Sequence, residues 1–151
     1  MKKREQTILI KDADYIVTMD SSNRILKHAS LFIEGQVLRE IDSKRTSAGR
    51  VISARGKIVI PGLINCHHHM FQCVMRGMPD LQNQTIDQCI SIVCETTRKM
   101  DAETIYYSAL ANMAELLLYG CTTTTDMLYI FPKGKKGWME ATIRAAQDIG
   151  I

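Results

Sequence analysis

The sequence predicts an α/β fold in which an all-β segment is followed by a region of strands and helices. Residues 1–60 contain short β-branched or apolar runs between turn residues and show no helical period. Pro61-Gly62 then marks a break in the pattern. Residues 61–151 run strand, helix, helix, strand, helix, which is how an α/β fold with parallel strands begins. We therefore predict two domains, 1–60 and 61–151.

Turn chemistry separates the strands expected in the first domain. Residues 20–23 (Asp-Ser-Ser-Asn) favour a turn, Gly35 favours a hairpin, and the polar stretch 42–50 is typical of a loop. His28 lies between polar residues and is expected at the surface. The predicted strands are 7–10, 14–19, 30–34, 36–41, 51–54 and 57–60.

The second domain is expected to begin with a strand at 63–66 that runs into three histidines. Apolar residues spaced by three and four predict a helix over 85–99, with Ile86, Ile90 and Val93 on its buried face. A second helix is expected to begin after Asp101, an expected N-cap, and to end at Gly120. Its apolar series is Tyr106, Leu110, Met113 and Leu117. The β-rich run 121–126 predicts a second strand. A basic loop and a last helix, closed by Gly150, complete the pattern.

The composition is that of an ordinary globular domain and excludes several classes of function. Of 151 residues, 46% are apolar and 23% charged, which excludes a disordered chain, a collagen and a coiled coil. The net charge of +3 argues against a nucleic-acid or membrane partner. Five cysteines without a C-x-x-C pair predict reduced thiols, and hence a cytoplasmic protein in which they fill small core positions.

The three consecutive histidines, residues 67–69, are the strongest chemical signal. In an extended chain, side chains at i and i+2 point to the same side, so His67 and His69 should face one way and His68 the other. Two adjacent imidazoles suit zinc or ferrous iron. The alternative is a chance histidine cluster in a loop, although only four histidines occur in the whole chain.

The residues around these histidines resemble the amidohydrolase superfamily. The segment from Ile60 to His69, apolar-Pro-Gly-apolar-apolar-Asn-x-His-x-His, is similar to the first barrel strand of that family. The strand-rich run 52–59 and the segment 120–126 match further family features. Residues 67–72 and 129–132 look most like the branch that contains oxoguanine deaminases and hydroxy-triazine aminohydrolases.

The resemblance implies a fold and a role for particular residues. The fold would be an incomplete (β/α)8 TIM-type barrel preceded by part of a small β-sandwich. His67 and His69 match the metal ligands of the first strand, for one divalent metal, zinc before iron. Gln72 matches a residue that contacts the ring substrate, although it could instead be a polar cap of the first loop. His68 would hydrogen-bond behind the strand, and Asp126 would be a structural acceptor.

The implied reaction is hydrolysis of a C–N bond in a small heterocycle by a metal-activated water, as in a deaminase. The family's further ligands and its acid/base residue come from later strands, and no histidine follows His69. No catalytic residue is therefore assigned, and we expect an N-terminal fragment that is inactive in isolation and self-associates. The alternatives are an inactive remnant or binding module, or an amidohydrolase of other chemistry, such as cyclic-amide ring opening or dehalogenation. The His-x-Glu and Pro-Cys-x-x-Cys pattern of other zinc deaminases does not occur.

Overall fold

Residues 6–151 are described by a computed structural model, in which the chain separates into two units, Met1–Pro61 and Gly62–Ile151. The first unit contains one five-stranded sheet, in which the order β3-β2-β1-β4 is completed by β5 pairing with β1. Strands β1 to β3 are antiparallel, whereas β4 and β5 run parallel to β1. The strands are β1 (Thr7–Val17), β2 (Ile25–Glu34), β3 (Val37–Ile41), β4 (Arg50–Ser53) and β5 (Ile58–Val59).

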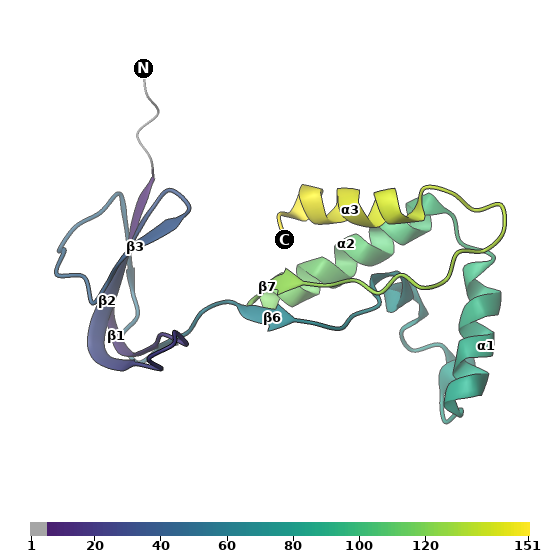
Figure 1. Cartoon of the computed structure of the whole chain (residues 1–151), viewed down its shortest axis with the longest axis horizontal. Helices are drawn as coiled ribbons and strands as arrows, with labels where there is room; N and C mark the ends of the chain where they lie inside the picture. The colour runs from purple at the N-terminus through teal and green to yellow at the C-terminus, as the bar shows by residue number, and fades with distance from the viewer. Residues whose placement is uncertain (1–5) are drawn as a thin grey trace, which may run out of the picture. The chain divides into compact units, whose positions relative to one another are not determined.

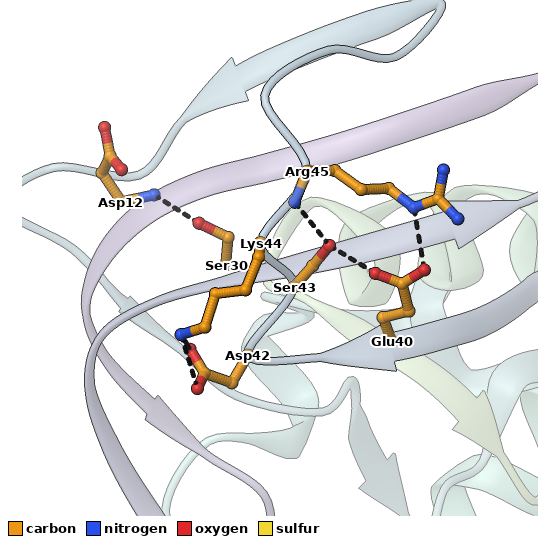
Figure 2. Close-up of polar contacts among 7 residues, drawn as sticks. All are labelled: Asp12, Ser30, Glu40, Asp42, Ser43, Lys44 and Arg45. Atoms are coloured by element: carbon orange, nitrogen blue, oxygen red, sulfur yellow. Dashed lines mark hydrogen bonds and ion pairs between the residues drawn. The ribbon is translucent and has the colours of Figure 1, made fainter.

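Strand β1 is continuous where the sequence predicts two strands. Its register against β2 shifts between Ile10 and Ala13, and Asp12 has a positive φ of 58°. The Asp12 N–H leaves the ladder and donates to Ser30 Oγ at 3.1 Å (Figure 2). The bulge therefore absorbs the polar Lys11-Asp12 pair without ending the strand. Strand β2 also begins earlier than predicted, at Ile25.

The loop after β3 is held by polar contacts that Figure 2 shows. Glu40 accepts hydrogen bonds from Ser43 Oγ at 2.6 Å and from Arg45 Nε at 2.8 Å. These two donors lower the pKa of the Glu40 carboxyl, the serine bond more than the arginine. The Arg45 guanidinium also lies 4.0 Å from the centre of the Phe32 ring. The predicted loop is thus an ordered segment.

The second unit is built on a short parallel pair of strands with helices beside it. Helix α3 lies along α2 (Figure 1), and Tyr106 Oη of α2 donates to Asp148 Oδ2 of α3 at 2.8 Å. Two 3₁₀ segments, η1 and η2, occupy the stretch between the histidines and α1. The elements are β6 (Leu63–Asn65), η1 (Met70–Met75), η2 (Pro79–Leu81), α1 (Ile86–Thr97), α2 (Ala102–Leu118), β7 (Cys121–Thr124) and α3 (Trp138–Ile149).

The helix ends follow the sequence signals. The side chain of Asp101 accepts from the Thr104 N–H at 2.8 Å, which confirms the predicted N-cap of α2. Helix α1 begins with a capping box between Thr85 and Gln88. Gly120, with φ of 83°, follows α2 in the left-handed conformation expected of a helix stop.

The buried faces differ from those that periodicity indicates. Helix α2 buries Ile105, Ala109 and Met113. Only Met113 belongs to the apolar series predicted for this helix, and the other two buried residues each precede a member of that series by one position. On α1, the predicted apolar positions Ile86 and Ile90 are 72% and 43% exposed. One core cluster of this unit consists of Met70, Ala109, Met113 and Ala145. The other is formed by residues from η1, α1, α2 and α3 and from the segment before α2. These residues are Phe71, Met75, Val93, Met100, Ile105, Trp138 and Ala141.

The cysteines are free, as predicted, but they do not all fill the core. Cys121 is buried, whereas Cys66 is exposed, because it follows the last residue of β6 on an open segment. The remaining three are partly buried. Within residues 6–151, no helix combines the length and apolar character needed to span a membrane.

Candidate metal and substrate site

The three histidines follow β6 and do not form part of it. The strand ends at Asn65, one residue earlier than predicted, and the histidines come after its end, as the sequence predicts. The chain nevertheless stays beside the segment after β7, because the Thr125 N–H donates to Asn65 O at 2.9 Å and the Met127 N–H donates to His68 O at 2.7 Å. These bonds keep successive side chains on alternate sides of the segment.

His67 and His69 point toward one another. Their Nε2 atoms are 3.2 Å apart, and their ring centres are 4.9 Å apart with an angle of 87° between the planes. Two nitrogens at about 2.0–2.1 Å from a tetrahedral zinc would lie about 3.3–3.4 Å apart. The pair therefore has the spacing of two ligands that share one cation.

The backbone fixes the tautomer of His69. Its Nδ1 lies 2.8 Å from the Met127 carbonyl oxygen, so Nδ1 carries the proton and Nε2 keeps its lone pair. A carbonyl in this position is the usual second-layer partner of a metal-binding imidazole. Among residues 6–151, no cluster of three or more His, Cys, Asp or Glu side chains could hold a metal, so the described chain offers this pair without a third ligand.

His68 faces the other way, as the alternation predicts. Its Nε2 lies 3.1 Å from Oδ1 of Asn112, which is almost fully buried on α2. On the same side of the segment, Ser108 Oγ donates to the Met70 carbonyl at 2.8 Å. Helix α2 thus holds the chain at the residue before His69 and at the residue after it.

Asp126 is a structural acceptor, in agreement with the sequence. Its Oδ1 accepts the Met70 N–H at 2.9 Å, which ties the start of η1 to the segment after β7. Burial raises the pKa of the Asp126 carboxyl, and the Met70 N–H and the nearby imidazoles of His69 and His68 oppose that rise.

Gln72 lines an open pocket of about 370 Å³ together with all three histidines and Asn112. Its Nε2 donates to Tyr129 Oη at 2.9 Å. Arg76 lies on the same pocket, where it forms an exposed ion pair of 2.7 Å with Glu115 of α2, and this carboxylate raises the pKa of the guanidinium. Gln72 is thus placed where a substrate contact could occur, beside the two histidines.

Gly62 is required by the close approach of β6 to β7. A Cβ at this position would lie within 3.0 Å of three side-chain atoms of Thr122. The Leu63 N–H donates to the Gly120 carbonyl at 2.8 Å, which holds the two chains together at this point. The Pro-Gly pair in the sequence therefore allows the strand that leads to the histidines to pack against its neighbour.

Two residues of the site carry no clear signal in the sequence. Tyr129 lies on a segment without regular structure, and Asn112 lies in the middle of a helix that reads as apolar. Nothing in the local pattern connects Tyr129 to Gln72 or Asn112 to His68. The polar Asn112 on the buried face of α2 could have been noticed as a residue that needs a partner.

Comparisons with known proteins relate the chain to a family of hydrolases. The sequence profile of the Amidohydrolase family matches residues 58–151. A 5-methylthioadenosine/S-adenosylhomocysteine deaminase of Acetivibrio thermocellus is 35% identical over 150 residues, covering 95% of this chain and 32% of that protein. A 5'-deoxyadenosine deaminase of Methanosarcina barkeri is 31% identical over 145 residues, covering 95% of this chain and 33% of that protein.

A solved structure agrees with these relatives. The crystal structure of atrazine chlorohydrolase from Arthrobacter aurescens TC1, complexed with zinc, has a TM-score of 0.89 and 33% identity. The match covers 95% of this chain and 34% of that one. The chain therefore spans about a third of the length of the relatives it matches.

Proposed function

Because the chain belongs to the amidohydrolase family, we propose that it is the N-terminal portion of a metal-dependent hydrolase that cleaves a C–N bond of a small heterocycle. The observation that carries the proposal is the pair of converging imidazoles, His67 and His69, beside an open pocket. The names of two relatives, both deaminases, support the reaction class.

The proposed cofactor is one divalent metal, zinc before iron. The imidazole pair fits it, because the Nε2 separation of 3.2 Å suits two ligands of one ion and the Met127 carbonyl frees Nε2 of His69 for coordination. His67 and His69 would hold the zinc ion, which when bound would lower the pKa of a water toward 7 and so would supply hydroxide at neutral pH. The zinc in the related atrazine chlorohydrolase supports this choice.

The other residues of the pocket would bind and orient the substrate. Gln72, partly buried beside the histidines, would contact the ring through its amide. Arg76 is held by Glu115, so its guanidinium is oriented at the pocket without being strongly desolvated. No residue of this chain is proposed as the acid or base.

We also propose that β6 and β7 with their helices are the first units of a TIM-type barrel, and that the sheet of the first unit is part of a small β-sandwich. The parallel β6–β7 pair, followed by α3, supports the first assignment. The sandwich rests on the resemblance alone, since the described residues of the first unit form one sheet.

Metal binding by the 151-residue chain is the direct test. Titration with zinc, followed by calorimetry, and with cobalt, followed by visible absorption, should show one site. His67→Ala and His69→Ala should each abolish it, since one imidazole cannot hold the ion alone. The control is His28→Ala, because His28 is exposed and lies on β2 of the other unit. Equal binding by all three variants would contradict the assignment.

Activity is tested on the complete gene product. Zinc-loaded protein should release ammonia from an amino-substituted purine, pyrimidine or triazine, and His67→Ala should remove the activity. A protein that binds no metal and releases no ammonia from any of these would contradict the proposed function. It would favour the alternative of a non-catalytic remnant or binding module.

A second candidate reaction is removal of a halide from a heterocycle. The similarity to an atrazine chlorohydrolase favours it specifically. The two reactions attack the same type of ring carbon and differ in the leaving group. Parallel assays of chloride and ammonia release from chloro- and amino-substituted triazines distinguish them.

Self-association is proposed for the chain as it stands. Ile64 on β6 is 69% exposed and Leu118 at the end of α2 is 86% exposed, and apolar surface of this kind favours association. Light scattering should show species larger than a monomer, and Leu118→Glu should reduce their size. A monodisperse monomer at high concentration would contradict this proposal.

A further inference from the structure

Gln72, which lines the pocket beside the histidines, forms a hydrogen-bonded pair with Tyr129, and the remaining polar atoms of this pair are unused. Gln72 Nε2 donates to Tyr129 Oη at 2.9 Å, so the phenol oxygen acts as an acceptor and its proton is free. Among residues 6–151, this is the sole hydrogen bond of the Gln72 side chain, so its Oε1 is also without a protein partner. The pair therefore offers one acceptor beside one donor.

Tyr129 is held in place by rings on the same side of the segment. Its ring centre lies 5.0 Å from that of His69 and 5.6 Å from that of Phe71, both in edge-to-face arrangements. Phe71 is fully buried, whereas Tyr129 is 45% exposed. The ring is thus fixed at its base by the core and presents its hydroxyl group at the surface.

The segment that carries Tyr129 also orients a proposed metal ligand. Met127, two residues earlier, accepts from His69 through its carbonyl and donates to the His68 carbonyl through its N–H. The position of Tyr129 relative to His69 is therefore set by bonded backbone. A substrate held by the Gln72–Tyr129 pair would lie at a fixed distance from the imidazole pair.

We propose that Tyr129 is a specificity-determining residue of this site, and that Gln72 Oε1 and the Tyr129 hydroxyl together read the edge of an aminoheterocycle. A ring nitrogen next to an exocyclic amino group presents one acceptor beside one donor. The amino group donates to Gln72 Oε1, and the ring nitrogen accepts from Tyr129 Oη. A site built to bond such an edge rejects an analogue that lacks one partner, because a polar group is then left unpaired. This inference rests on the proposed function.

The test compares two ligands that differ at one ring atom. The probes are 5'-deoxyadenosine and its 1-deaza analogue, which keeps the amino group and has C–H in place of the adjacent nitrogen. Dissociation constants are measured by calorimetry on the metal-free complete gene product, so that no turnover occurs. The wild type should favour the first ligand by about tenfold, the value of one hydrogen bond.

Tyr129→Phe should remove this preference while it retains the ring that packs on His69 and Phe71. The matched control is Tyr107→Phe on α2, because the Tyr107 ring is 58% exposed and makes no side-chain hydrogen bond among the described residues. Gln72→Leu should weaken both ligands about equally, since both carry the amino group. An unchanged preference in Tyr129→Phe would overturn the proposal, as would binding of neither ligand by the wild type.

A second measurement examines the pair without any ligand. In the 151-residue chain labelled with ¹⁵N, the side-chain amide resonances of Gln72 should shift in Tyr129→Phe and stay in place in Tyr107→Phe. Unmoved resonances in Tyr129→Phe would overturn the proposal. Failure of the proposed function has a different signature, namely loss of zinc binding and of ammonia release, and neither is measured in these two experiments.

Discussion

Replacing Gly62 with alanine tests whether the close approach of β6 and β7 positions the site. The new Cβ would lie 2.8 Å from Thr122 Cβ, which no side-chain rotation can move. Carbon atoms pack at about 3.5–4.0 Å, so the two chains would have to separate by about 0.7 Å or more. Overpacking of this kind costs about 1–3 kcal/mol.

The upper half of that range applies, because β6 has three residues and cannot spread the displacement along a long strand. Urea unfolding of the chain should therefore show Gly62→Ala less stable by about 2–3 kcal/mol. Zinc affinity should also fall, since β6 leads directly to His67. Thr122→Gly in the same chain should restore most of the loss. A change below about 0.5 kcal/mol, or no rescue, would refute the reasoning.

Three further predictions concern the support of the site and the surface of the chain. Asn112→Leu should lower the free energy of unfolding by about 1–3 kcal/mol in urea, because His68 loses its partner. The pKa of Asp101 is lowered by its bonds from Thr104, so its stabilisation is present above about pH 4 and lost as pH falls through the folded pKa. The difference in Tm between wild type and Asp101→Ala should accordingly shrink on acidification. A thiol reagent should label Cys66 first and Cys121 last, as mass spectrometry of the peptides would show.

Much of the fold could be predicted because the signals that define it are local. The Asp101 N-cap and the left-handed Gly120 depend on a few neighbouring residues. The continuity of β1 could not be predicted in this way. Its bulge is stabilised by Ser30, eighteen residues away, and such a contact leaves no periodic trace.

The site could be predicted where its geometry follows from alternation along the chain. His67 and His69 converge and His68 turns away, although the strand ends before them. The partners of these histidines could not be predicted. The Met127 carbonyl is a backbone group common to every residue type. Tyr129 reaches Gln72 from a segment without regular structure, which has no sequence signature.

The backbone origin of the bond to His69 has a consequence for how this chain tolerates substitution. Every amino acid carries a carbonyl and all but proline carry the N–H that bonds His68, so every replacement at position 127 other than proline should leave the imidazole aligned, and the Met127 side chain is 44% exposed. Mutational scanning would therefore report this position as silent. Proline, or an inserted or deleted neighbour that shifts the peptide group itself, would expose its importance.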